Sequence, residues 1–366
     1  MIDGEAEIDV QNVQNYAGYV LHTGYMKYGT LKVGDEVICE YDELRRNPIR
    51  NNHTGTHVLN YALRTVLGDE IDQKGSLVAA EKLRFDFSHK AQVTDAELEK
   101  IENISSQYID RNSTVYSKEV PLATARNIKG VRAVFGETYP DPVRVVSVGI
   151  PVDDLLQDVQ NDHWMEVSVE FCGGTHVDKT GEIKKLIILE ENGIAKGIRR
   201  IVAVTGQAAY DVQRDASLFA ERLAALEKMQ FSPKKVDESK RLRTDLDALA
   251  ISTITKKKLN DQYSKIATGI LDAQKAATKA ANKKVLDSVT NYFAEHKDAK
   301  SLVLKLPFST PNKAIGEAIK YVSSKQKDKT VYLIGTDEVE GKVTHGCHVA
   351  AVSRVDNFAP YTLGIG

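Results

Sequence analysis

Two pairs of side chains have the types and the spacing of metal ligands. His53 and His57 are four residues apart in a segment whose apolar residues recur at helical spacing, and residues i and i+4 of a helix share one face. Cys172 and His176 repeat this spacing later in the chain, with two glycines between them that permit a tight turn. One thiolate with three imidazoles suits a tetrahedral Zn²⁺ ion. We therefore predict a site for one zinc ion.

Each pair taken alone has an ordinary alternative, namely histidines packed in the core or exposed at the surface without a metal. The occurrence of both pairs, each beside Gly and Thr, favours the metal site. Thr54, Gly55 and Thr56 separate the first two ligands, so the glutamate of a metalloprotease His-Glu-x-x-His helix is missing and that class is disfavoured. Four protein ligands would also close a tetrahedral site. A catalytic zinc would then lose a ligand, expand its coordination, or anchor the reacting group.

Composition and charge place the chain in an ordinary class. Hydrophobic residues at 42%, charged residues at 27% and a net charge of −2 describe a soluble globular protein, so any affinity for nucleic acid must come from a local patch. The three cysteines are few, odd in number and far apart, which favours a reducing compartment. No apolar run reaches the roughly 18 residues of a membrane span, and the acidic N-terminus does not resemble a signal peptide. We expect a cytoplasmic protein with no membrane partner.

The elements that must position the ligands fall in a mixed α+β region. A chain of 366 residues predicts two or three domains. Short β-rich runs in residues 1–45 indicate part of a β-barrel. We assign residues 46–205, which contain the four ligands, to the zinc-binding domain. The predicted strands are 17–21, 31–33, 36–41, 83–87, 131–135, 143–147, 168–171, 183–189 and 199–204, and the predicted helices are 52–67, ending at Gly68, and 95–112.

The sequence pattern changes in the second half of the chain. Residues 206–300 are almost wholly helical in pattern, and Pro233 predicts a break within a long α-helical hairpin. Residues 256–284 hold eight lysines against two aspartates, a local charge of +6. Residues 301–366 predict a small α/β domain with strands at 301–306 and 331–334 around a helix at 313–323. The His345, Cys347 and His348 side chains are few and close in sequence, so a packed strand is a better interpretation than a second metal site.

The motifs around the ligands resemble the editing domain of alanyl-tRNA synthetase and, more distantly, free-standing alanyl-tRNA editing proteins. The resemblance covers about residues 10–350, and the helical and terminal segments resemble the oligomerisation and tRNA-binding C-terminal region of that family. The matching segments are Asn52-His-Thr-Gly-Thr-His57, Gln73-Lys-Gly-Ser-Leu77, Leu83-Arg-Phe-Asp-Phe-Ser-His89, Phe135-Gly-Glu-Thr-Tyr139, Phe171-Cys-Gly-Gly-Thr-His-Val177 and Gly197-Ile-Arg-Arg-Ile201.

The resemblance implies hydrolysis of the ester in Ser-tRNA(Ala) and Gly-tRNA(Ala), with tRNA(Ala) as the partner. It implies Thr56 and Gln73 as catalytic candidates that read the serine hydroxyl or orient water, although a helix cap and a turn residue are their ordinary interpretations. The family also implies substrate contacts from a further group of residues, for which solvated salt bridges and a solvated lysine face are the alternatives. These residues are Gly173, Gly174, Thr175, Arg84, Arg199, Arg200 and the lysines at 256–258, 275, 279, 283 and 284.

The resemblance leaves two questions open. The zinc ion could polarise the attacking water, or it could hold the terminal adenosine while a ribose hydroxyl helps to activate water. The start of the family's barrel, its glycine-rich C-terminal stretch and its ATP-dependent aminoacylation domain have no match here. We therefore expect a fragment that edits but does not ligate alanine and that self-associates or pairs with the missing synthetase portion. The alternative function is a non-catalytic tRNA-binding or assembly fragment, and the alternative location is the mitochondrion.

Overall fold

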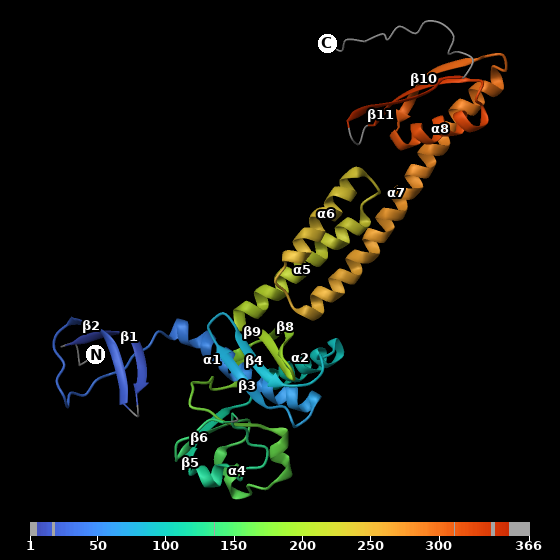
Figure 1. The fold of residues 1–366 in the computed structure, drawn as a ribbon. Helices are drawn as coiled ribbons and strands as arrows, with labels where there is room; N and C mark the ends of the chain where they lie inside the picture. The colour runs from blue at the N-terminus through green and yellow to red at the C-terminus, as the bar shows by residue number, and fades with distance from the viewer. Residues whose placement is uncertain (1–5, 17–18, 135, 311, 338–340, 351–366) are drawn as a thin grey trace. The chain divides into compact units, whose positions relative to one another are not determined.

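The computed structural model describes residues 6–16, 19–134, 136–310, 312–337 and 341–350. The chain forms two compact units. The first comprises residues 1–216 and 250–255, and the second comprises residues 217–249 and 256–366. The mixed α+β class predicted from the sequence is confirmed (Figure 1). No helix in the described residues is long and apolar enough to cross a membrane.

A four-stranded antiparallel sheet with two helices on one face is the framework of the first unit. The helices are α1 (Glu43–Leu67) and α2 (Asp95–Asp110). The strands, in spatial order, are β3 (Gln73–Val78), β4 (Leu83–Ser88), β9 (Ile198–Thr205) and β8 (Leu186–Ala195). Alternate residues Leu83, Phe85 and Phe87 point into the core and are fully buried with the apolar faces of both helices. Packing in this core sets the distance between α1 and the sheet.

A smaller sheet carries the second ligand pair. It consists of β5 (Val115–Val120), β6 (Val143–Val148) and β7 (Ser168–Phe171), all antiparallel, with β6 in the centre. Short helices α3 (Leu122–Ala125) and α4 (Val152–Gln157) and a 3₁₀ turn, η1 (Asp162–Glu166), connect its strands. The second turn, η2 (Thr180–Ile183), leads from the ligand loop to β8. All four side chains of β7 are buried, so the strand ends at a fixed point immediately before Cys172.

The N-terminal region differs from the expectation. Its described residues form one antiparallel hairpin, β1 (Glu7–Tyr16) with β2 (Tyr19–Tyr28), and no closed barrel. The strands predicted at 31–33 and 36–41 are wrong, because those residues are irregular and exposed. Residues 17 and 18 of the predicted 17–21 strand lie outside the described residues. Within the part of the chain that the structure describes, segment 31–41 belongs to none of the sheets.

Other helices and strands of the first unit agree with their predicted boundaries to different degrees. Helix α1 ends at Gly68 as predicted, but it begins nine residues earlier than residue 52, at an Asp42 cap that accepts a hydrogen bond from the Arg45 amide. The predicted strand at 131–135 is reduced to a single bridge at Arg132, and residue 135 lies outside the described residues. Strands β3 and β5 were not predicted, because exposed polar residues interrupt the alternation of apolar and polar side chains that marks a strand.

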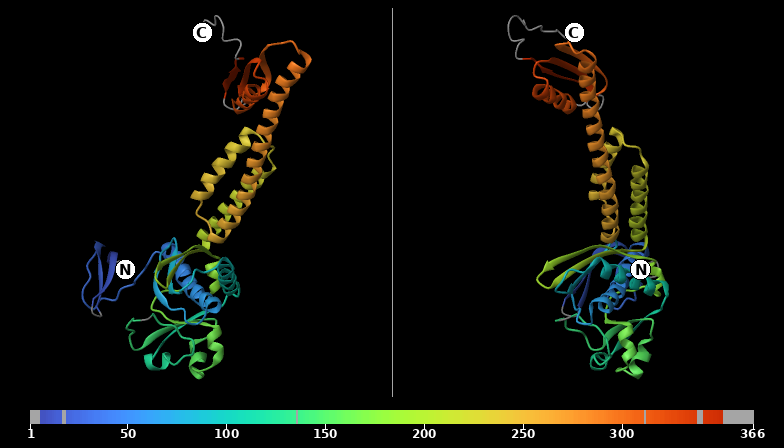
Figure 2. Two further views of the ribbon diagram at one scale, coloured as in Figure 1. Left: turned by 45° about the vertical axis from the view of Figure 1, so that its right-hand side comes forward. Right: turned by 90° about the vertical axis from the view of Figure 1, so that its right-hand side faces the viewer.

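Three successive helices dominate the middle of the chain: α5 (Gly206–Lys228), α6 (Pro233–Ala248) and α7 (Thr253–Glu295). Pro233 is the first residue of α6 and Ser232 caps it, so the break predicted at this proline is confirmed. A further break at residues 249–252 was not predicted, and the simple hairpin is not confirmed. Figure 2 shows α6 alongside α7, where Arg243 donates to the side chain of Asn260 at 2.8 Å.

The C-terminal strands have the predicted βαβ arrangement with one addition. Strands β10 (Ser301–Ser309) and β11 (Thr330–Asp337) are parallel, with α8 (Asn312–Lys325) between them in sequence. Strand β12 (Lys342–His348) pairs antiparallel to β11. The strand expected for residues 344–348 is thus confirmed, but it is not packed throughout, because His345 and Cys347 are exposed and Thr344 alone is buried. The core of this part includes Val285 and Val289 of α7, so the long helix is anchored to the small sheet.

Candidate functional site

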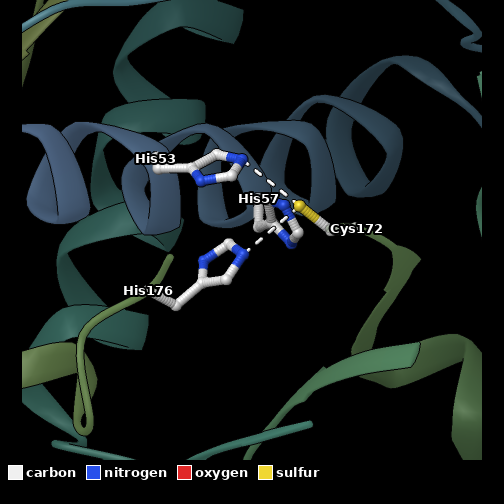
Figure 3. A group of neighbouring side chains, drawn as sticks. All are labelled: His53, His57, Cys172 and His176. Atoms are coloured by element: carbon white, nitrogen blue, oxygen red, sulfur yellow. Dashed lines mark hydrogen bonds between the residues drawn. The ribbon is translucent and has the colours of Figure 1, made fainter. Parts of the chain in front are cut away.

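The four predicted ligands lie together in one group. One donor atom from each of His53, His57, Cys172 and His176 can be chosen so that all lie within 4.8 Å of one another. The Nε2 atoms of His53 and His176 both lie 3.3 Å from Cys172 Sγ, as the dashed lines in Figure 3 show. Ligands around a tetrahedral Zn²⁺ ion at about 2.0–2.3 Å would stand roughly 3.3–3.7 Å apart. The group therefore has the dimensions of a metal site.

Two of the three residues between the histidine ligands hold α1 against its neighbours, and the third bonds within the helix. Thr54 Oγ1 lies 3.1 Å from His176 Nδ1 and accepts a hydrogen bond from the Val177 amide, so it ties the first motif to the second. Gly55 faces β9, where a Cβ would approach the Thr205 methyl at 3.0 Å. Thr56 donates to the Asn52 carbonyl at 2.9 Å. Thr54 and Gly55 thus fix two sides of the helix against other segments, whereas the Thr56 bond stays within the helix.

Asn52, immediately before the first ligand, joins α1 to two other segments. Its side-chain nitrogen donates to the carbonyls of Ala79 and Ala80, and its oxygen accepts from Thr205. The side chain is fully buried, so these bonds cannot be exchanged for bonds to water. Together they fix the rotation of α1 and therefore the direction of His53.

The loop from Cys172 to His176 is held by an arginine that sequence reasoning missed. Arg144 of β6 donates to the carbonyls of Cys172 and Gly174 at 3.0 and 2.6 Å. Gly174 lies against His53, and a Cβ there would collide with the imidazole ring. Gly173 has open space around the same position. Only one of the two glycines is therefore required by contact with a ligand.

Hydrogen bonds orient two of the imidazoles. The Nδ1 of His53 lies 3.1 Å from the Thr175 carbonyl, which can only accept, so Nδ1 carries the proton and Nε2 keeps its lone pair. His176 has Thr54 at Nδ1, which leaves its Nε2 for the cluster. The Nδ1 of His57 is buried and has no hydrogen-bond partner among the described residues. A buried nitrogen without a partner, beside three other donors, fits the binding of a cation.

Burial keeps the histidines neutral. It lowers the pKa of His53 and lowers the pKa of His57 well below its usual value. Burial, with the charges of His53 and Arg144, lowers the pKa of His176 to about 3. Burial also raises the pKa of the Cys172 thiol. Neutral imidazoles are the form that binds metals, and a bound cation displaces a thiol proton.

A cavity of about 90 Å³ opens beside the ligands. Both catalytic candidates line it: Thr56, buried on α1, and Gln73, the first residue of β3. Gln73 is in a strand, not in a turn, and its amide nitrogen donates to Ser76 at 3.1 Å. The structure thus brings both residues to the ligand group.

Two buried polar residues of the cavity were missed by the sequence analysis. Glu170 of β7 lines the cavity with its Oε2 3.7 Å from His57 Nε2, and Asn60 donates to its Oε1 at 3.0 Å. Burial raises the pKa of Glu170 to about 7. A carboxylate therefore stands beside the histidines after all, although it comes from β7 and not from the helix. Its position between the apolar residues Val169 and Phe171, two residues before Cys172, was the available signal.

The predicted tRNA-contacting arginines all lie near acidic side chains. Arg200 donates to both oxygens of the buried Asp86 at 2.7 and 2.8 Å, and Arg84 lies 3.6 Å from the same carboxylate. Arg199 is paired in the same two-pronged way with Glu191. None of the three lines the cavity beside the ligands. The hydroxyl of Thr175 lies 3.5 Å from Arg46.

The second cluster of potential ligands, in β12, does not come together. His345 and Cys347 point to one face of the strand, whereas His348 points to the other, since side chains alternate along a strand. Within the described residues, the His53, His57, Cys172 and His176 group is the one that meets the geometry of a metal site.

Comparison with known proteins first defines the class of domain. Residues 143–202 match the family model of the threonyl and alanyl tRNA synthetase second additional domain. This segment contains Cys172 and His176 with β6, β7, β8 and most of β9. Residues 209–273 match the alanine–tRNA ligase domain model.

The full-length comparison is more specific. The chain is 56% identical over 351 residues to the alanine–tRNA ligase of Candida albicans and 51% identical over 350 residues to that of Schizosaccharomyces pombe. It is 53% identical over 352 residues to the mitochondrial alanine–tRNA ligase of Saccharomyces cerevisiae. Each match covers 96% of this chain and 36% of the relative. The chain belongs to the alanine–tRNA ligase family and spans about a third of the length of these relatives.

Proposed function

We propose that this chain hydrolyses the ester bond of tRNA(Ala) mischarged with serine or glycine, using one Zn²⁺ ion bound by His53, His57, Cys172 and His176. The observation that carries the proposal is the convergence of these four donor groups beside a cavity lined by polar side chains. The match to a second additional domain of threonyl and alanyl tRNA synthetases supports the same function.

The need for a second site follows from the size of the substrate. A pocket for alanine cannot exclude glycine sterically, and a missing methylene is worth only about 1–3 kcal/mol. Serine adds one hydroxyl, which an apolar pocket rejects weakly. A separate hydrolytic site that pairs with the hydroxyl discriminates better, because alanine would leave its polar groups without partners.

The reaction adds water across the ester. The water oxygen bonds to the carbonyl carbon, the bond from that carbon to the ribose oxygen breaks, and a proton from water passes to the ribose oxygen. A bound Zn²⁺ ion would supply Lewis-acid chemistry at this place. The side chains of Thr56 and Gln73 would hold water or the substrate in the cavity, and Thr54 and Thr175 keep His176 and His53 correctly turned.

The tRNA would extend from the cavity over neighbouring surfaces. We propose Gly173, Gly174 and Thr175 as the rim of the acceptor-end site. Arg84, Arg199 and Arg200 are proposed as contacts to its phosphates, and they would keep their acidic partners while doing so. The exposed lysines of α7 are proposed as a long-range electrostatic attraction for tRNA. Cytoplasmic and mitochondrial ligases both occur among the relatives, and we propose the cytoplasm for this chain.

ATP-dependent ligation of alanine is proposed for the complete family protein and not for this chain alone. Self-association, or pairing with the remaining portion of a synthetase, is proposed as the way in which editing and ligation are joined. The second candidate function is a tRNA-binding or assembly segment without catalysis. It is favoured by the exposed apolar residues of the β1–β2 hairpin, which would be covered in a larger assembly.

A deacylation assay tests the proposal. Zinc-loaded protein is incubated separately with Ser-tRNA(Ala), Gly-tRNA(Ala) and Ala-tRNA(Ala), and the remaining aminoacyl ester is followed with time. Selective loss of the serine and glycine esters is expected. The variant Cys172→Ala should lose zinc and activity together. Persistence of all three esters with zinc bound would instead indicate the binding segment.

A further inference from the structure

Asn60 is a cavity residue whose amide oxygen has no partner. It lies on α1, three residues beyond His57 and therefore about 4.5 Å further along the helix axis. The residue is 4% exposed and lines the cavity beside the ligands. Its side-chain oxygen is buried and accepts no hydrogen bond from the described residues. Such an unpaired acceptor is costly unless a ligand or water supplies a donor.

Glu170 sets which end of the amide is unpaired. The Asn60 nitrogen donates to Glu170 Oε1 at 3.0 Å. This bond turns the amide nitrogen towards Glu170 and leaves the amide oxygen as the end without a partner among the described residues. The backbone of Glu170 is held on both sides, by Val146 of β6 and by the bridge to Arg132. The backbone position of Glu170 beside Asn60 is therefore fixed.

Two other polar side chains of the cavity, Thr56 and Gln73, each donate a hydrogen bond to a described residue, and their oxygens can still accept one. Thr56 donates to the Asn52 carbonyl within α1, and the Gln73 amide donates to Ser76. These two residues remain suited to positioning water. The buried acceptor of Asn60 instead calls for a donor that arrives with the substrate.

We propose that Asn60 determines specificity by accepting a hydrogen bond from the side-chain hydroxyl of a misacylated serine. This inference rests on the proposed deacylase function and names the residue that reads its substrate. An alanyl ester would place a methyl group against the acceptor and leave it unpaired. A glycyl ester would leave that space to a water molecule, which can donate in place of the hydroxyl. The same acceptor thus admits serine and glycine and disfavours alanine.

The test is Asn60→Leu, which keeps the approximate size of the side chain and removes the acceptor. Its control is Thr65→Val, on the same helix but exposed and outside the cavity. Rates of deacylation are measured for seryl, glycyl and alanyl tRNA(Ala). The Leu variant should lose about tenfold or more on the seryl ester, keep its rate on the glycyl ester and gain activity on the alanyl ester. The control should match the wild type on all three.

Other outcomes contradict the proposal in distinguishable ways. An unchanged seryl rate in the Leu variant would show that Asn60 does not read the hydroxyl. Equal loss on the seryl and glycyl esters would indicate a contact to a group common to both, or a structural role, and Asn60→Ala would then be measured to remove any clash of the larger side chain. Equal loss in that variant too would overturn the proposal. A wild-type protein inactive on both esters would refute the deacylase function itself.

A binding measurement separates recognition from catalysis. Non-hydrolysable 3′-seryl-amido and 3′-alanyl-amido analogues of adenosine are titrated calorimetrically into zinc-loaded protein. The wild type should bind the seryl analogue more tightly, and Asn60→Leu should bind the two equally at unchanged zinc content. Retention of the seryl preference in the variant would overturn the proposal.

Discussion

The ligand group and the basic face of α7 are both polar, but they are built in opposite ways. Around the ligands the polar atoms are buried and individually held, as Thr54 and Arg144 hold the two halves of the group. Along α7, Lys279 and Lys283 are exposed, and Lys275 makes a surface ion pair with Asp272 at 3.3 Å. The first arrangement depends on exact placement, whereas the second depends on summed charge. Single substitutions should therefore be severe in one region and mild in the other.

The largest expected effect comes from Gly174→Ala. The new Cβ would collide with the His53 ring and displace a ligand from the group. We expect loss of stoichiometric zinc, measured by elemental analysis of the purified protein. Gly173→Ala is the matched control, since no described atom other than those of its chain neighbours lies within 4 Å of the added Cβ, and it should retain zinc. Equal zinc content in both variants would mean that the loop does not close on His53 as described.

Arg144→Met should weaken zinc binding without abolishing it. The guanidinium supports the ligand loop from outside by bonding to the Cys172 and Gly174 carbonyls. Loss of a support of this kind typically costs about 10–100-fold in metal affinity. Competition with a chromophoric chelator measures the affinity. An affinity equal to that of the wild type would remove Arg144 from the site.

Tyr108 links α2 to the strand that carries Glu170. Its hydroxyl accepts from the Ser168 amide at 3.2 Å, and burial raises its pKa to about 12. The folded state therefore keeps this proton between pH 10 and pH 12, where the unfolded state loses it. Stability must fall as pH rises through this range, by about 1 kcal/mol between pH 10 and pH 11.

The variant Tyr108→Phe lacks this titration. Urea unfolding of both proteins at pH 9 and pH 11 should show a stability difference that shrinks or reverses at the higher pH. A difference that is constant across the two pH values would contradict the burial of the hydroxyl.

The smallest effects are expected on α7. Lys279→Ala with Lys283→Ala should change the free energy of unfolding by less than about 0.5 kcal/mol for each position. If both lysines contact phosphates, the slope of log affinity for tRNA against log salt should fall by roughly one per lysine. Filter binding at several salt concentrations measures this slope. An unchanged slope would assign these lysines to a solvated helix face.

The features that could be predicted from the sequence are those with a local pattern. The ligands were recognisable because each pair is local: four-residue spacing fixes His53 with His57, and glycines identify the turn before His176. Helices α2 and α8 and strands β4, β6, β10 and β11 followed from regular apolar spacing. These signals need no knowledge of distant residues.

What the sequence did not reveal depends on contacts between distant segments. Asn60 meets Glu170 across 110 positions of sequence, and no local pattern indicates that contact. In the sequence, Arg144 looks like an ordinary polar residue of a strand, and only the folded structure shows its bonds to the Cys172–His176 loop. The β1–β2 hairpin was predicted only in part, by the strand at 17–21 that overlaps the start of β2, because most of its residues are exposed and no alternation of burial shapes its sequence.

The most direct test of the whole account is X-ray absorption at the zinc edge of the purified, zinc-loaded protein. The described group predicts one sulfur at about 2.3 Å and three nitrogens at about 2.0–2.1 Å, with the sulfur lost in Cys172→Ser. A first coordination sphere without sulfur, or a sulfur signal that survives this substitution, would contradict the four-ligand site.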